Sequence, residues 1–92
     1  MISEEELIKH KWKYIPESHS WQKLGVTFRD VDRALHNYSV RFNGPLSCCI
    51  HASTLYGLEC NIKMCVSTIF SNKQFHTQLS IKQKRTLKNW IL

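Results

Sequence analysis

The spacing of apolar residues changes along the chain, and each spacing predicts a type of element. At the N-terminus, Ser3 and Glu6 have the spacing of a capping box, with acids in the first turn, which predicts a helix to about Lys11. Farther along, four apolar residues recur at intervals of three and four: Phe28, Val31, Leu35 and Tyr38. These intervals place them on one face of a helix. We therefore expect a second, amphipathic helix over residues 28–38.

From Val40 onward the apolar residues alternate with polar ones, which is the pattern of half-buried strands. A first strand ends at the turn signal Asn43-Gly44-Pro45. The alternation resumes over residues 46–53 and, after a break at 54–57, continues over residues 58–70. We expect three antiparallel strands here, of which the second and third form a hairpin.

Ser80 and Gln83 have the capping-box spacing and predict a C-terminal helix. The expected fold class is α+β: a small two-layer domain with two N-terminal helices, a three-stranded antiparallel sheet and a C-terminal helix. The chain of 92 residues suffices for one hydrophobic core, so we expect a single domain over residues 1–92. The N-terminus lacks the apolar run of a secretory signal, and no window is apolar enough to span a bilayer. We accordingly expect an intracellular protein, cytoplasmic or nuclear, that is not secreted and has no transmembrane segment.

All four cysteines lie within the expected hairpin, where strand register decides which way each side chain points. Pairing Ala52 with Leu58 keeps the apolar residues of both strands on one face. That register directs Cys48 and Cys60 into the core, where they act as small apolar side chains with free thiols. It directs four residues outward: Cys49, His51, Glu59 and Cys65. His51 and Glu59 then stand opposite each other as an expected cross-strand ion pair.

The same register argues against cysteine chemistry. Cys49 and His51 would be about 6–7 Å apart along the strand, which is too far for a nucleophile and its base. A disulfide between Cys48 and Cys60 would have to cross the hairpin diagonally. Four zinc ligands come together only if a strand bends: Cys49, His51, Cys65 and His76. We expect neither a metal nor a cofactor, and keep that zinc set as the alternative.

The formal net charge of +6 is confined to the last third of the chain. Residues 1–59 contain seven cations and all seven acids, whereas residues 60–92 contain six Lys and Arg residues and no acid. Such asymmetry indicates an acidic partner, most directly nucleic acid or nucleoprotein, with an anionic membrane surface or a host protein as alternatives. The residues expected to bind this partner are Lys73, Lys82, Lys84, Arg85 and Lys88.

No P-loop, dinucleotide fingerprint, HExxH or GxSxG motif occurs, so we expect a small basic interaction protein that is not an enzyme. One alternative is a peripheral-membrane or matrix-like structural protein, whose C-terminal helix would insert apolar residues into a bilayer: Leu87, Trp90, Ile91 and Leu92. If those side chains instead close the core, the basic arc of the helix stays available to a polyanion. A further alternative is a module that docks on a host protein through the faces around Trp21 or His51.

The segment TFRDVDRALHNYSVRFNG, Thr27–Gly44, resembles part of the matrix proteins of rhabdoviruses. The similar residues are Thr27, Phe28, Asp30, Val31, Ala34, Leu35, Tyr38, Phe42 and Gly44. A proline followed by an extended apolar stretch, from Pro45, is similar in kind. The resemblance covers about a fifth of the chain, which lacks the long basic, proline-containing N-terminal arm of that family. It implies a small viral protein with a structural or host-interfering role that binds nucleocapsid, membrane or a host factor.

Overall fold

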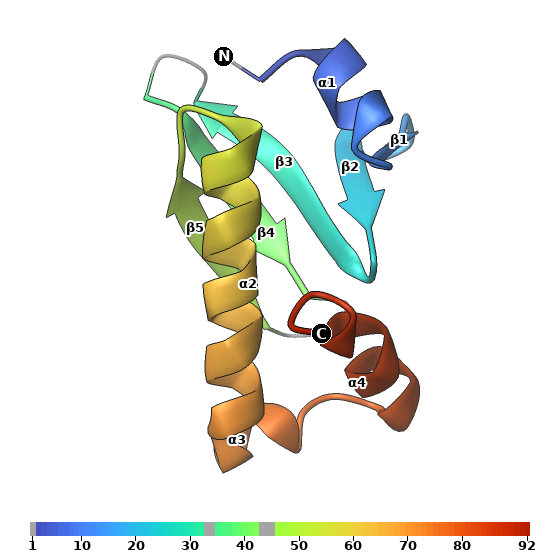
Figure 1. The fold of residues 1–92 in the computed structure, drawn as a ribbon, viewed down its shortest axis with the longest axis vertical. Coiled ribbons are helices and arrows are strands. Elements are labelled where there is room, and N and C mark those ends of the chain that lie inside the picture. The colour runs from blue at the N-terminus through green and yellow to red at the C-terminus, as the bar shows by residue number, and fades with distance from the viewer. Residues whose placement is uncertain (1, 33–34, 43–45) are drawn as a thin grey trace.

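A five-stranded antiparallel sheet forms the centre of the fold, and its strands are neighbours in chain order from β1 to β5 (Figure 1). The structure is a computed structural model that describes residues 2–32, 35–42 and 46–92. The strands are β1 Lys13–Ile15, β2 Ser20–Lys23, β3 Val26–Asp32, β4 Asn37–Arg41 and β5 Ser47–His51. The helices are α1 Glu4–Lys9, α2 Leu55–Ser71, α3 Lys73–His76 and α4 Ile81–Lys88.

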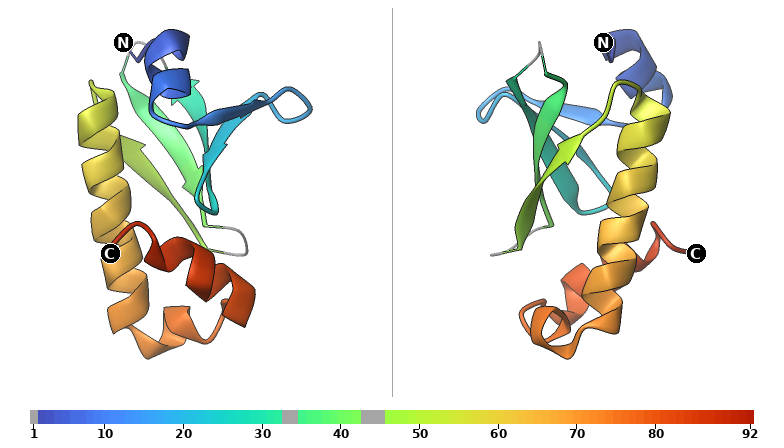
Figure 2. Two further views of the ribbon diagram at one scale, coloured as in Figure 1. Left: turned by 45° about the vertical axis from the view of Figure 1, so that its right-hand side comes forward. Right: turned by 90° about the vertical axis from the view of Figure 1, so that its left-hand side faces the viewer.

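The sheet and the long helix α2 make two layers, with α1 and α4 at opposite ends of the molecule (Figure 2). The core between the layers contains apolar side chains from both, including Val26, Val40, Leu58 and Ile62, which are fully buried. The structure is α+β, but the expected arrangement is wrong: the sheet has five strands where three were expected, and among the described residues one helix, α1, precedes it where two were expected. None of the described helices is long and apolar enough to cross a membrane.

The second helix expected over residues 28–38 is wrong, because residues 28–32 lie in β3 and residues 37–38 in β4. Phe28 and Val40 are paired across the two strands and are both buried. Val31 and Leu35, which the helical interpretation placed in the core, are 60% and 58% exposed. The intervals of three and four were therefore coincidental. Burial follows the period of two that a sheet requires along β4 and from Val26 to Phe28 in β3.

The third strand expected over residues 58–70 is also wrong, because this segment lies in α2. Thr54 caps the helix, and its hydroxyl accepts a hydrogen bond of 3.0 Å from the backbone N–H of Gly57. The buried residues of the helix are Leu55, Leu58, Ile62, Val66 and Ile69. Leu58, Ile62 and Val66 are four positions apart and share a face both in a helix and in a strand, so they fitted both interpretations. The expected hairpin register, with Ala52 opposite Leu58, does not exist.

The predictions that rested on local sequence signals agree more closely with the structure than the two just described. The strand expected over residues 46–53 is β5, and the strand expected to begin at Val40 is the end of a longer β4. The first helix ends at Lys9, slightly before the expected position, and is capped by the Ser3 hydroxyl. The predicted capping box at the start of α4 is complete, because Ser80 and Gln83 exchange backbone-to-side-chain hydrogen bonds of 3.1 and 3.2 Å. The turn signal at residues 43–45 lies outside the described residues.

The hairpin between β2 and β3 turns through only two residues, Leu24 and Gly25. Their φ angles are 48° and 79°, and both are positive, as in the turn type that matches the twist of a hairpin. Glycine adopts this conformation freely, but leucine is strained in it. A contact from another part of the chain stabilises the turn and offsets this strain. The indole Nε1 of Trp90 donates a 3.0 Å hydrogen bond to the carbonyl oxygen of Leu24.

Candidate functional site

Two buried apolar residues pack α4 and the turn that follows it against the rest of the molecule. Leu87, within the helix, is fully buried, and Trp90, in the turn that follows it, is 4% exposed, so both side chains belong to the core. The Trp90 ring lies 5.8 Å from that of Trp12, and the ammonium group of Lys23 lies 5.4 Å from the Trp90 ring centroid. These contacts fix the orientation of α4, and therefore decide which of its side chains face solvent.

The cations of α4 lie on a broad arc of the helix, from Lys84, about 60° from Leu87, to Arg85 and Lys82 on the far side. Successive residues of a helix are separated by about 100°, which spreads the four cations over the broad arc left by the buried residue. Lys82, Arg85 and Lys88 are exposed, and Lys84 is half-buried. Ile81 lies within the same arc and is 71% exposed. The structure thus brings four of the five expected residues together on one helical surface, which we call the α4 cationic face.

Lys73, the fifth expected cation, lies on α3 and is exposed. Helices α3 and α4 lie at the same end of the molecule (Figure 1). No Asp or Glu occurs after Glu59, so neither helix carries a carboxylate that could neutralise these cations. Glu59 itself is engaged elsewhere: it accepts a 3.0 Å hydrogen bond from the indole of Trp12 and pairs with Lys23 at 3.3 Å. The expected ion pair between Glu59 and His51 is therefore wrong.

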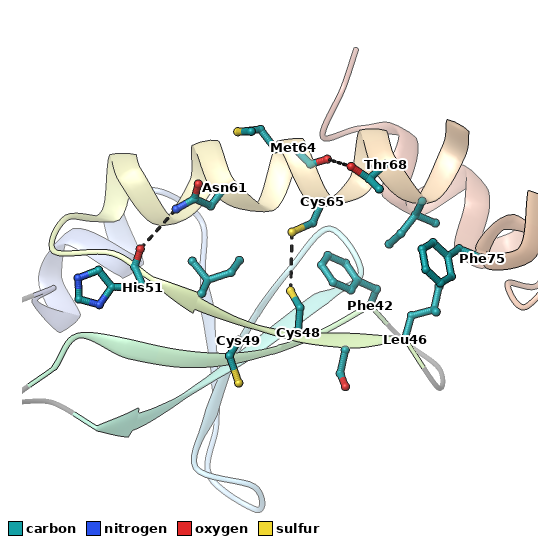
Figure 3. Close-up of a pocket in the computed structure, with 13 residues that line it drawn as sticks. Phe42, Leu46, Cys48, Cys49, His51, Asn61, Met64, Cys65, Thr68 and Phe75 are labelled. Atoms are coloured by element: carbon teal, nitrogen blue, oxygen red, sulfur yellow. Dashed lines mark hydrogen bonds between the residues drawn. The ribbon is translucent and has the colours of Figure 1, made fainter. Parts of the chain in front are cut away.

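The cysteines are distributed differently from the expected hairpin. Cys48 points from β5 toward α2, where its sulfur lies 3.7 Å from that of Cys65 (Figure 3). Burial, and after it the neighbouring Cys65, raise the pKa of the Cys48 thiol to about 12. Cys48 is consequently a protonated thiol near neutral pH and a poor nucleophile. Cys65 was expected to face outward, and Cys60 to face inward on a strand; both are instead half-buried on α2.

The structure does not assemble the alternative zinc set of Cys49, His51, Cys65 and His76. Cys49 and Cys65 lie on opposite sides of β5, because Cys49 points away from α2 and is exposed (Figure 3). His51 is turned toward Asn37, with 3.3 Å between its Nδ1 and the amide oxygen. The ring of His76 packs near Phe70. Within the described parts of the chain, no three potential metal ligands form a group.

A cavity of about 580 Å³ opens between β5 and α2 (Figure 3). Sequence reasoning missed this cavity, because its helical wall had been interpreted as a strand. Most of its lining comes from β5 and α2, with Phe42 after β4, Leu46 before β5 and Phe75 on α3. The lining residues are Phe42, Leu46, Ser47, Cys48, Cys49, Ile50, His51, Asn61, Met64, Cys65, Thr68, Ile69 and Phe75. None of these side chains is a Lys, Arg, Asp or Glu. We call this cavity the β5–α2 groove.

A second cavity of about 440 Å³ lies over β3 and β4 and is more polar. Arg29 and Arg41 line it with the hydroxyl residues Thr27 and Ser39. Thr27 is paired with Arg41, and Arg29 with Ser39, so the two guanidinium groups come from diagonal positions of one ladder. The two arginines bring positive charge together locally, within the part of the chain whose formal charges sum to zero. No local pattern had indicated that they would share a cavity.

No protein-family model, no curated protein and no solved structure matches this chain. The resemblance of residues 27–44 to rhabdovirus matrix proteins therefore stays a prediction. The function has to be argued from the two surfaces described above: the α4 cationic face and the β5–α2 groove.

Proposed function

We propose that the protein is a small, non-enzymatic interaction protein that binds a polyanion, most directly a nucleic acid or nucleoprotein, through the α4 cationic face and Lys73. One observation carries this proposal. One broad arc of α4 carries Lys82, Lys84, Arg85 and Lys88. The orientation of this arc is fixed by Leu87 within the helix and by Trp90 directly after its end. Cations that are displayed on a rigid element, with no carboxylate on that element, remain available to an external anion.

The apolar residues in and directly after α4 favour a polyanion over a bilayer. The membrane alternative required Leu87 and Trp90 to insert into lipid, but both side chains are buried against the core. Extracting them would expose the apolar surface that holds α4 in place, at a cost of several kcal/mol. The exposed apolar residues that remain are Ile81, Ile91 and Leu92. They are too few for the broad apolar face that an interfacial helix uses.

Lysine and arginine on such a helix neutralise phosphates rather than read bases. A helix of eight residues is about 12 Å long, which matches three or four phosphates along one strand of a duplex. Phosphate contacts position a protein on nucleic acid without selecting sequence. The proposed binding is therefore sensitive to salt and has little sequence preference.

The test removes charge from the α4 cationic face and compares it with equal charge removal elsewhere. The first variant is Lys84→Gln, Arg85→Gln and Lys88→Gln. The control variant is Lys9→Gln, Lys11→Gln and Lys13→Gln, which lowers the net charge equally at exposed positions. Fluorescence anisotropy with a labelled, mixed-sequence single-stranded RNA in low salt measures the affinity of each, and circular dichroism checks their folding.

We expect the α4 variant to bind RNA at least about 30-fold more weakly than the unmodified protein, because three phosphate contacts and their counterion release are lost. The control variant should stay within about threefold. Equal affinities for all three proteins would overturn the proposal. An equal loss in both variants would show that net charge, rather than the α4 cationic face, determines binding.

A further inference from the structure

The outer edge of β5 carries backbone groups that face away from the sheet. The Phe42 N–H donates to the Leu46 carbonyl at 3.1 Å, and the Ala52 N–H donates to the His36 carbonyl at 3.0 Å. In an antiparallel ladder such bonds recur at every second residue. Residues 46, 48, 50 and 52 therefore bond to β4. The three residues between them direct their N–H and C=O groups outward: Ser47, Cys49 and His51.

The position of Asn61 agrees with this assignment. Its side-chain amide donates to the carbonyl oxygen of His51 at 3.5 Å, which requires that oxygen to point away from β4 and toward the α2 side (Figure 3). β5 is the last strand of the sheet, and the right-hand view of Figure 2 shows no strand outside it. The His51 carbonyl is thus satisfied by a side chain. In the described chain, the other outward groups have no partner among the backbone hydrogen bonds.

The two edges of the sheet differ in how they are protected. β1, the opposite edge, has only three residues, begins with Lys13 and is followed by Pro16. Short length, lysine and proline are the features by which proteins prevent unwanted strand pairing. β5 has five residues, Ser47–His51, and contains no lysine, arginine, acid or proline. It therefore keeps the properties of a strand that accepts another strand.

The β5–α2 groove lies beside this open edge and determines what kind of strand fits. Cys48, Ile50 and Cys65 are among the residues of its lining, and the lining is uncharged. Met64, which is 67% exposed, and Phe75 also line the cavity. A strand paired with β5 would turn every second side chain toward α2 and into this space. Charged side chains would be desolvated there without a partner, so the groove selects apolar ones.

We propose that the β5–α2 groove binds an extended, uncharged peptide segment of a partner protein, which adds a sixth strand to the sheet at β5. The outward N–H and C=O groups of Ser47 and Cys49 supply the backbone hydrogen bonds, as in other cases of recognition by strand addition. Alternate apolar side chains of the segment enter the groove and provide specificity. This site is separate from the α4 cationic face. It binds an uncharged segment with apolar side chains, whereas the α4 cationic face binds a polyanion.

A second copy of this chain is a poorer occupant than a foreign segment. If two copies paired through β5, the incoming strand would carry Cys48 and Ile50 toward the helix layer. In each copy these two side chains already pack with its own α2 and core. They are therefore not free to fill the groove of a neighbour, and the outer edges would meet over a small area with little additional apolar burial.

The test selects ligands from a display library of random eight-residue peptides on the full protein in reducing buffer. Cys49→Pro removes an N–H that faces outward, which an edge strand tolerates while losing its capacity to pair. Thr68→Lys introduces a charge into the groove from an exposed position and leaves β5 unchanged. Ser67→Lys is the control, because Ser67 is exposed on α2 and does not line the groove.

We expect selected peptides to show alternating apolar residues and to bind Cys49→Pro and Thr68→Lys at least about tenfold more weakly than the unmodified protein. Binding to Ser67→Lys should be unchanged. If Cys49→Pro does not fold, Thr68→Lys alone decides. Absence of selection, acidic peptides that bind without regard to these substitutions, or a dimer that Cys49→Pro dissociates would each overturn the proposal. These outcomes are independent of RNA binding by α4.

Discussion

Trp90 is the residue on which the display of the α4 cationic face depends, so its removal gives the most informative stability prediction. The side chain is 4% exposed, and replacement of a buried Trp by alanine costs about 3–5 kcal/mol. Trp90→Phe keeps an aromatic ring but loses the hydrogen bond from Nε1 to Leu24, worth about 0.5–1.5 kcal/mol. The weaker face that phenylalanine offers to the Lys23 ammonium adds up to about 1 kcal/mol.

Urea denaturation followed by circular dichroism measures both effects as changes in the free energy of unfolding. We expect a loss of about 3–5 kcal/mol for Trp90→Ala and about 1–2 kcal/mol for Trp90→Phe. Ile91→Ala is the matched control at the neighbouring, 40% exposed position, and should cost less than about 1 kcal/mol. If Trp90→Ala costs no more than the control, α4 is not anchored as described and the argument for its orientation fails.

Three other predictions concern single residues. Leu24→Asn should stabilise the protein by up to about 1 kcal/mol in thermal or urea unfolding, because Asn tolerates the positive φ that strains Leu; a destabilised variant would refute the turn assignment. The pKa of Cys48 is raised from 9.0 to about 12, so the folded protein holds this proton more tightly than the unfolded chain. The stability advantage over Cys48→Ala should therefore be complete below pH 9 and shrink as the pH rises toward 12, whereas a constant difference would contradict the burial. Cys49 is the exposed cysteine and should react first with a thiol reagent such as DTNB, so Cys49→Ser should remove the fast phase.

The features that could be predicted from the sequence were those encoded by near neighbours. The capping residues Ser3 and Ser80 act within one turn, so their spacing alone indicated where two helices begin. The cationic arc of α4 was predictable for the same reason, because it depends only on helical periodicity and on which residues are apolar.

The errors arose where two periodicities coincide. Leu58, Ile62 and Val66 repeat every fourth residue, which is compatible with a helix and with one face of a strand. Two signals favoured the helix: Thr54 has the position of a cap, and the alternation over residues 58–70 is longer than ordinary strands. At Phe28 a strand was mistaken for a helix. Phe28 is buried because it pairs with Val40 on the neighbouring strand, and local spacing does not reveal such a partner.

The groove could not be predicted once α2 had been assigned as a strand, because the cavity lies between a strand and a helix. The contact of Cys48 with Cys65 was lost for the same reason. Such features depend on which elements pack together, and the local spacing of residues does not contain that information.

The salt dependence of RNA binding tests the central claim most directly. If Lys73 and the four cations of α4 each contact one phosphate, five contacts at about 0.7 each predict a slope of about −3.5 in log affinity against log salt concentration for single-stranded RNA. Affinity should then fall about 100-fold between about 50 and about 200 mM salt. A slope shallower than about −1, or no binding at the lower salt concentration, would contradict the proposed polyanion-binding function of the α4 cationic face.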